Sequence, residues 1–320
     1  MGAYLIRRLL WIPITVILIS IVVFLLVRFL PGSTVDLIIA EQQGMAGSAQ
    51  ISRSSIEHTL GLDVPVYIQY SRWISNIVVH GSFGKSLQNS TDVTQEILSS
   101  LPVTLELCIL GLIIGVMFAI PIGVYSAIRQ DTILDYTIRS IAIILISIPS
   151  FWLGTVIMIY PSIWWGWSPP MELISFTKNP IGNLGMFIIP ALVLGASLTG
   201  GLVRMVRTMM LEVLRQDYIR TAWAKGLNER VIIIRHTLKG ALIPVITVIG
   251  LLLPSIIGGS VIIEQIFVLP GVGRLLLKAL LQRDYAVVSG VNLFIAVFVV
   301  VINFFVDFSY GWLDPRIRHQ

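Results

Sequence analysis

The sequence predicts an all-α integral membrane protein with about six transmembrane helices. Of its 320 residues, 56% are hydrophobic and only 12% are charged, and the mean hydropathy is +0.88. A soluble domain carries roughly 25% charged residues. The apolar residues form uninterrupted runs close to the ~20 residues that a helix needs to cross a bilayer. Continuous runs favour helices over a β-barrel, whose strands alternate apolar and polar positions.

The first apolar run extends from Leu9 to Val27 and follows Arg7 and Arg8. A charged start before an apolar run is also typical of a signal peptide. The run leads into Leu30-Pro-Gly-Ser33 without a small-x-small cleavage site, so we expect an uncleaved first transmembrane helix within residues 1–30.

Residues 31–99 are polar enough to form an external subdomain after this helix. Ser52–Leu62 is predicted to be a helix that ends at Gly61. Pro65–Val79 is predicted to be a second, amphipathic helix, because aromatic and aliphatic residues recur along one face. These are Tyr67, Tyr70, Trp73, Ile74 and Ile77.

Residues 100–310 are predicted to form a core of five further transmembrane helices, and residues 311–320 a short tail. No internal repeat is visible in the sequence. Several runs contain proline, which permits kinks in membrane helices. The five runs are Leu107–Ala127, Ile141–Trp167, Ile181–Val203, Gly240–Ile263 and Tyr285–Val306.

The positions of Lys and Arg predict the orientation of the chain. Most of the 22 Lys and Arg residues fall in the segments that share a side with the N-terminus when six spans are assumed. Because cytoplasmic loops carry an excess of basic residues, both termini are predicted to be cytoplasmic. The net charge of +5 is then a topology signal, and nucleic-acid binding is not needed to explain it.

The sequence offers no catalytic, cofactor or metal site. Cys108 is the single cysteine, which excludes an intrachain disulfide, and the four histidines form no pair at metal-ligand spacing. Gly81-Ser-Phe-Gly84-Lys85-Ser86 ends like a phosphate-binding loop, but Val79 stands where that pattern needs glycine. We therefore expect that the chain is not an enzyme and binds no ATP itself.

The basic segment 204–239 separates two apolar runs and contains a candidate surface helix. Asp217 can cap this helix, Tyr218–Lys225 can form two turns, and Gly226 can take the left-handed conformation that ends it. Helical spacing puts Tyr218, Thr221, Ala222 and Lys225 on one face, where the small Thr221 and Ala222 would admit a partner's groove. The alternative is a loop whose arginines only follow the topology bias.

Arg220-Thr-Ala-Trp-Ala-Lys-Gly226-Leu227, followed by Arg235-His-Thr-Leu-Lys239, resembles the cytoplasmic EAA loop of the membrane subunits of binding-protein-dependent ABC importers. The resemblance is greatest to the dipeptide, oligopeptide and nickel permease branch. Other segments agree with that branch in the same order: Leu60-Gly-Leu-Asp-x-Pro65 with Gln69-Tyr70 and Trp73, Gly81-Ser-Phe-Gly84-x-Ser86, Leu101-Pro-x-Thr104-Leu, and Glu264-x-Ile-Phe-x-x-Pro270-Gly-Val-Gly273-Arg274.

The resemblance implies a type I ABC importer permease fold in a bacterial or archaeal plasma membrane. It implies four kinds of partner: a second homologous permease subunit, two cytoplasmic ABC ATPases that bind ATP and Mg, an extracytoplasmic substrate-binding protein, and membrane lipid. It also implies that a helix near 217–227 couples to an ATPase. The residues concerned are Asp217, Tyr218, Arg220, Thr221, Ala222, Lys225, Gly226 and Leu227.

Residues 264–274 form a second candidate site, a possible external loop that faces the binding protein or gates the pathway. A re-entrant loop and a plain tight turn are both compatible with its two glycines. Its candidate residues are Glu264, Phe267, Pro270, Gly271, Gly273 and Arg274.

Departures from the broad loop pattern are Arg220-Thr-Ala222 in place of Glu-Ala-Ala and Gly240 in place of a common Asn. The first is usual for the peptide branch. The alternative function is a secondary transporter or another polytopic protein that works without an ATPase. A secondary transporter needs an ion site near the midplane. Glu106 and Asp307 fall at the edges of spans instead, where hydration accounts for them. The sequence does not identify the cargo.

Overall fold

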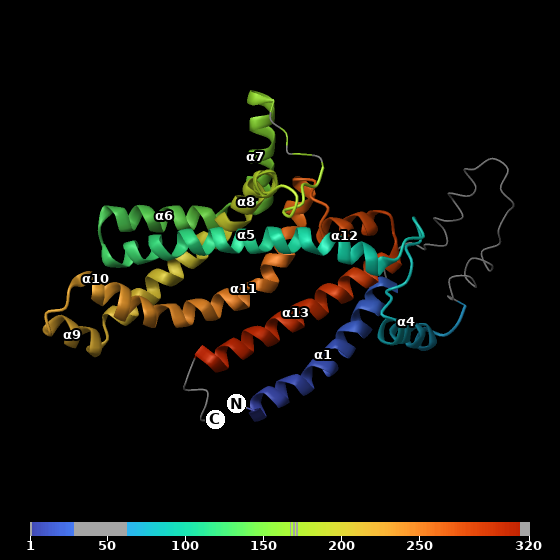
Figure 1. Ribbon diagram of the computed structural model, residues 1–320, viewed down its shortest axis with the longest axis horizontal. Coiled ribbons are helices and arrows are strands. Elements are labelled where there is room, and N and C mark those ends of the chain that lie inside the picture. The colour runs from blue at the N-terminus through green and yellow to red at the C-terminus, as the bar shows by residue number, and fades with distance from the viewer. Residues whose placement is uncertain (1, 29–62, 167, 169, 171, 314–320) are drawn as a thin grey trace. The chain divides into compact units, whose positions relative to one another are not determined.

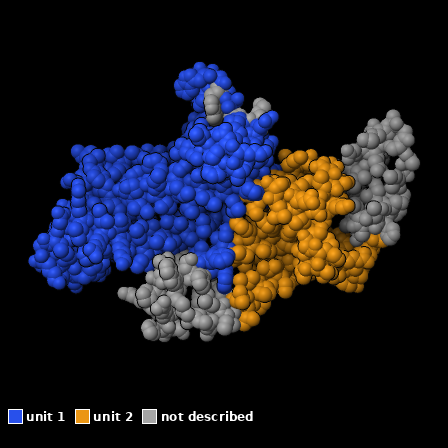
Figure 2. Space-filling view, in the orientation of Figure 1, with its two compact units in different colours: residues 1, 102–274, 302–320 blue, residues 2–101, 275–301 orange. Residues whose placement is uncertain are grey.

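The computed structural model describes residues 2–28, 63–166, 168, 170 and 172–313 of the chain. In these ranges the regular structure is helical, apart from an isolated bridge between Lys85 and Asp92. The chain divides into two units (Figure 2), one of residues 102–274 with 302–320, the other of residues 2–101 with 275–301. The predicted helix Ser52–Leu62 lies outside the described residues.

Five described helices are long and apolar enough to cross a membrane, and a sixth span results if one bent pair is counted as a single span. This agrees with the prediction of about six. Four of them are α1 (Gly2–Arg28), α5 (Val93–Ile128), α8 (Pro180–Leu214) and α13 (Tyr285–Leu313). The fifth joins α10 (Glu229–Val231), the π-helix η1 (Ile232–Leu238) and α11 (Lys239–Ile266).

The prediction of one continuous helix over Ile141–Trp167 was wrong. The segment forms α6 (Ile133–Ser147) and α7 (Ser150–Trp165), which meet at 90° (Figure 1). Pro149 separates them. A residue before proline is pushed out of the helical region, and Ile148 has φ −78° and ψ 120° accordingly. The proline also lacks the N–H that would continue α6.

The unit formed by residues 2–101 and 275–301 contains the predicted amphipathic helix as α4 (Val66–His80). Its aromatic residues pack on α1, where the rings of Tyr70 and Trp73 lie 5.5 and 5.6 Å from that of Phe24. The Tyr70 hydroxyl also hydrogen-bonds to the Ser20 hydroxyl at 2.8 Å. Tyr67, predicted on the same face, is exposed. α4 therefore rests on the first transmembrane helix through the middle of its apolar face.

α8 is the central helix of the larger unit, and its glycines allow close contact with its neighbours. A Cβ on Gly195 would lie 2.8 Å from the Gly111 carbonyl oxygen of α5, and one on Gly200 would lie 2.6 Å from the Ala142 carbonyl oxygen of α6. Small residues at such contacts let backbones approach in membrane proteins. Substitution of either glycine would force these helices apart.

Toward its C-terminal end, α8 packs between α5 and α11. Its residues Val206 and Met210 form a buried cluster with Ala127 of α5 and with Ala241 and Val245 of α11. Beyond this cluster α8 ends, and α9 (Asp217–Ala224) and α10 connect it to η1 at one end of the unit (Figure 1). α8 and α11 thus form the two attachments of the candidate surface helix.

Candidate functional site

α9 is the short helix predicted from the basic segment. It spans Asp217–Ala224, and Gly226 follows it with φ +74°, the left-handed conformation predicted for this glycine. The predicted capping role of Asp217 was wrong. Gln216 stands at the N-cap without a side-chain bond, and Asp217 is already the first helical residue. The Asp217 carboxylate lies 3.5 Å from the Arg220 guanidinium, and both groups are highly exposed. Such a pair stabilises a helix by little.

One side of α9 packs against the protein itself. Ile219 and Ala222 are buried together with Ile232 of η1, and Val213 and Leu214 of α8 cover this cluster. The expectation that Ala222 shares an exposed docking face with Thr221 was therefore wrong. With 7% of its surface exposed, Ala222 faces the helix attachments. The spacing rule placed it near Tyr218, but it did not show which neighbouring face would be covered.

The opposite side of α9 is open. Tyr218, Trp223 and Leu227 expose 51%, 48% and 39% of their surfaces. Arg220, Thr221, Lys225 and Gly226 are exposed around them. Aromatic residues combined with arginine are the composition favoured at protein interfaces. At about 100° per residue, Arg220 and Thr221 lie opposite the buried pair Ile219 and Ala222. Tyr218 and Trp223 lie exposed at the two margins of the buried side, so the open side is polar and cationic with an aromatic residue on each flank.

Tyr218 also touches the start of α11. A Cβ on Gly240 would lie 3.2 Å from the Tyr218 hydroxyl and 3.4 Å from Val213. Glycine in place of the common Asn at position 240 therefore leaves room for the Tyr218 hydroxyl, which a larger side chain would displace.

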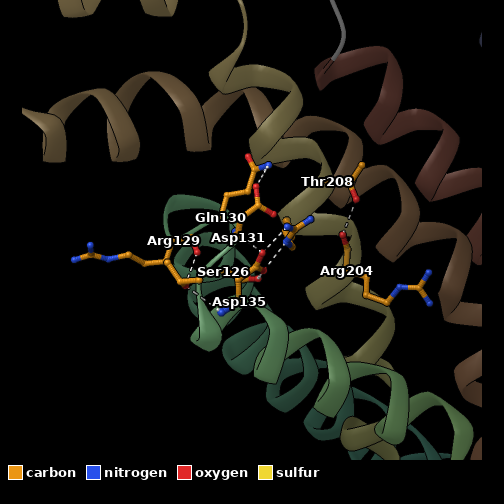
Figure 3. A network of polar contacts seen from close by, with 9 residues as sticks. Ser126, Arg129, Gln130, Asp131, Asp135, Arg204 and Thr208 are labelled. Atoms are coloured by element: carbon orange, nitrogen blue, oxygen red, sulfur yellow. Dashed lines mark hydrogen bonds and ion pairs between the residues drawn. The ribbon is translucent and has the colours of Figure 1, made fainter.

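A buried ion pair connects α6 to the C-terminal part of α8, the helix that leads into α9 (Figure 3). The Arg207 guanidinium donates through Nε to Asp135 Oδ1 at 2.8 Å and through Nη2 to Oδ2 at 2.7 Å. The Asp135 side chain has no exposed surface, and that of Arg207 has 16%. A two-point arginine–carboxylate bond fixes orientation as well as distance.

Two further donors complete the shell of the Asp135 carboxylate. The Ser126 hydroxyl on α5 donates to Oδ1 at 2.5 Å, and the backbone N–H of Asp131 donates to Oδ2 at 3.1 Å. Arg129 and Arg204 extend away from this network in Figure 3. The network thus ties α5, α6 and α8 together, and sequence reasoning missed it because its charged residues lie 72 positions apart.

Residues 264–274 form a closed turn rather than an open loop. Glu264 belongs to α11 and is completely buried, residues 267–271 turn, and α12 (Val272–Leu281) begins directly afterwards. Phe267, Gly271 and Gly273 are buried, Arg274 is half-buried, and Pro270 is exposed. The tight-turn alternative therefore describes the backbone better than a re-entrant loop does. The left-handed residue is Val268, with φ +58°, and neither glycine has positive φ.

The Glu264 carboxylate organises this turn. It accepts hydrogen bonds from the Thr104 hydroxyl at 2.7 Å, the Ser260 hydroxyl at 3.2 Å and the Arg274 backbone N–H at 3.0 Å. Gly271 packs directly on the carboxylate, so any Cβ there would collide with it. The Arg274 guanidinium donates to the Val268 carbonyl at 2.7 Å. Most of the candidate residues thus hold the turn in place.

The segment 81–86, which ends like a phosphate-binding loop, makes internal hydrogen bonds within the unit of residues 2–101 and 275–301. Asp284 accepts hydrogen bonds from the Ser86 hydroxyl at 2.6 Å and from the Leu87 backbone N–H at 3.0 Å. The Ser86 hydroxyl and the Leu87 N–H therefore bind a carboxylate of the chain itself.

Comparisons with known proteins identify a family. Residues 119–319 match the family described as "binding-protein-dependent transport system inner membrane component", and residues 1–108 match its N-terminal counterpart. The oligopeptide transport system permease protein AppB of Bacillus subtilis is 40% identical over 323 residues, covering 100% of both chains. The dipeptide transport system permease protein DppB of Escherichia coli K12 is 36% identical over 340 residues, covering 99% of each.

Two solved structures share the fold. The MetNI methionine ABC transporter in inward-facing conformations aligns with a TM-score of 0.57 and 18% identity, covering 68% of this chain and 96% of that one. The crystal structure of an amino acid ABC transporter with histidines aligns with a TM-score of 0.54 and 13% identity, covering 68% and 94%.

Proposed function

This chain belongs to the family of inner membrane components of binding-protein-dependent transport systems and is a permease subunit of an ABC importer; on that premise we propose that α9 is its coupling helix. The open side of α9 would sit in a groove on a cytoplasmic ATPase. The supporting observation is the division of α9 into a buried side, with Ile219 and Ala222, and an exposed side, with Arg220 and Thr221, flanked by the exposed Tyr218 and Trp223. Because its buried side packs on α8 and η1, a displacement of α9 by an ATPase would displace those two helices as well.

The proposed transmission runs through the two attachments of α9. A displacement of α9 acts directly on the end of α8 and, through Ile232, on η1 and α11. The Asp135–Arg207 pair and the glycine contacts of α8 would carry the movement of α8 to α6 and α5. Alternating access requires two discrete packings of such elements, biased by the nucleotide state of the partner.

An importer permease works with ATPase and substrate-binding partners. We propose that this chain pairs with a second, related permease subunit, so that each forms half of the pathway, and that the pair contacts two ATPases. ATP and Mg would bind to those ATPases. Hydrolysis would then take place outside this chain.

The chain is a multi-pass membrane protein of the inner membrane component family. We propose that both its termini are cytoplasmic, which places α9 beside the ATPases and the 264–274 turn outside. In that orientation the exposed Val268 and Pro270 are the parts of the turn that could reach the binding protein.

Peptides are the cargo that we propose. Relatives that match over their whole length are named as oligopeptide and dipeptide permeases, and that naming supports the proposal. Mass spectrometry of the ligand held by the cognate binding protein would identify the cargo, and a ligand without peptide bonds would contradict it.

The test of the importer assignment is copurification followed by transport. An affinity-tagged chain, extracted from its native membrane, should retain an ATPase and a second permease. Proteoliposomes holding the complex should accumulate a radiolabelled peptide, trialanine, only with ATP and the binding protein. Accumulation by vesicles that hold this subunit alone would refute the proposal.

A further inference from the structure

The helix that leaves α9 contains a π-helical segment, η1 (Ile232–Leu238). In a π-helix each N–H bonds to the carbonyl five residues earlier, so the segment takes up an extra residue compared with an α-helix. π segments are rare in proteins, and those that do occur frequently lie at functional sites. This one lies between the buried side of α9 and the start of α11.

The extra residue keeps one buried stripe continuous. Ile232, Thr237, Ala241 and Val245 are each 0–1% exposed, and they are spaced by five, four and four residues. Ala241 and Val245 pack on Val206 and Met210 of α8. Ile232 packs beside the end of the same helix, so the whole stripe faces α8.

An uninterrupted α-helix would break this alignment. At 3.6 residues per turn, the nine residues from Ile232 to Ala241 would place the two side chains about 180° apart. Once the π turn has absorbed one residue, the remaining eight leave them only about 80° apart. The π turn thus brings Ile232 round to the side on which α9 packs.

A side chain at the centre of the stripe holds this register. The Thr237 hydroxyl donates to the Ile232 carbonyl oxygen, five residues earlier, at 3.1 Å. In the α-helical parts of the chain the corresponding bond reaches four residues back, as from Thr199 to the Gly195 carbonyl at 2.8 Å. Thr237 has no exposed surface, so water does not substitute for the bond.

We propose that Thr237 is a positioning residue for coupling: its hydroxyl fixes the π register of η1, and this register seats Ile232 against Ile219 and Ala222 of α9. The inference rests on the proposed function of α9 as the coupling helix. It adds that the extra residue in η1 determines which side of the helix formed by η1 and α11 faces α9.

Two single-residue changes at the exposed Ile234 have opposite expected results. Deletion of Ile234 allows the segment to form an α-helix in which the four buried residues of the stripe follow one another at four-residue spacing. The stripe then still faces α8 and α9, so coupling should persist. Insertion of one alanine after Ile234 turns Ile232 away by about 100°, so coupling should be lost. Coupling is measured as ATP hydrolysis by the reconstituted complex with and without the binding protein and trialanine. Loss on deletion, or retention on insertion, would overturn the register account.

Thr237 is tested by Thr237→Val and Thr237→Ser, with Thr199→Val as the matched control. Loss of one buried hydrogen bond is worth about 1 kcal/mol, so Thr237→Val should lower stimulated hydrolysis about fivefold. Thr237→Ser keeps the hydroxyl and should restore it, and Thr199→Val should match the wild type. A merely structural defect would instead reduce the amount of assembled complex. Equal coupling in both Thr237 variants overturns the inference, whereas a wild-type complex without an ATPase overturns the proposed function.

Discussion

The carboxylate of Asp135 on α6 and the guanidinium of Arg207 on α8 form a two-point ion pair with N–O distances of 2.7 and 2.8 Å. Because the Asp135 side chain has no exposed surface, its charge depends on Arg207 and on the hydrogen bonds from Ser126 and Asp131. The pair holds together the helices through which a displacement of α9 would spread.

Removal of one charge from this pair should be costly. Arg207→Leu leaves a buried carboxylate without its cation, and breaking a buried pair costs about 3–5 kcal/mol. We expect the purified complex to melt at a lower temperature in a thermal-shift measurement. Arg204→Gln, which changes an exposed arginine that points away from the network, should have no such effect.

Exchange of the two charges should fail to rescue the protein. In the double variant Asp135→Arg/Arg207→Asp, the Asp131 N–H would face a cation that cannot accept its hydrogen bond, and the Ser126 hydroxyl would lose its carboxylate acceptor. The melting temperature of the double variant should stay below that of the wild type. Full recovery would mean that only the opposite charges matter and not the surrounding donors.

Gly226 should tolerate asparagine but not valine. Its φ of +74° costs L-residues roughly 1–2 kcal/mol, with β-branched residues the worst and asparagine among the best. No atom would touch an added Cβ, so backbone conformation is the main difference. Gly226→Val should insert into the membrane but lose ATP hydrolysis stimulated by the binding protein, and Gly226→Asn should retain it. Wild-type transport by Gly226→Val would count heavily against the coupling role.

The sequence predicted the helical class, the approximate number of spans and the position of α9, because apolar runs and a terminating glycine are local signals. It did not predict partners that are distant in the chain. Whether Ala222 faces a partner or Ile232 depends on how α9 folds back on η1, and no helical wheel of α9 alone contains that information. The π segment shows as a five-residue spacing between the buried Ile232 and Thr237, where an α-helix would space buried residues by three or four. The sequence alone does not reveal this spacing, because the burial of both residues comes from the structure.

The same limit applies to the 264–274 turn. The glycines suggested backbone freedom, but Gly271 is required by the neighbouring Glu264 carboxylate. Gly271→Ala should therefore lower the melting temperature of the complex, and Gly271→Ala in a Glu264→Ala background should cost much less. The difference between the two costs, measured as a double-mutant cycle, reports the contact. Equal costs in both backgrounds would show that Gly271 is needed for another reason.

Trp223 should contribute strongly to the contact with an ATPase. Truncation of a central interface tryptophan commonly costs about 2 kcal/mol, which is roughly thirtyfold in affinity. Trp223→Ala should weaken ATPase binding to the detergent-solubilised permease by that factor in a titration. Trp165→Ala, which changes an exposed tryptophan on α7, should leave the affinity unchanged. A similar loss in both variants would point to a general effect of removing tryptophan.

The central claim is that the open side of α9 faces an ATPase while its inner side packs on the permease. Cysteine cross-linking tests it directly, since the native Cys108 is buried. In the assembled complex, a short bismaleimide should link Thr221→Cys and Lys225→Cys to single-cysteine ATPase variants, while Ala222→Cys stays unlinked. Cross-links of equal yield from all three positions, or from none, would contradict the account.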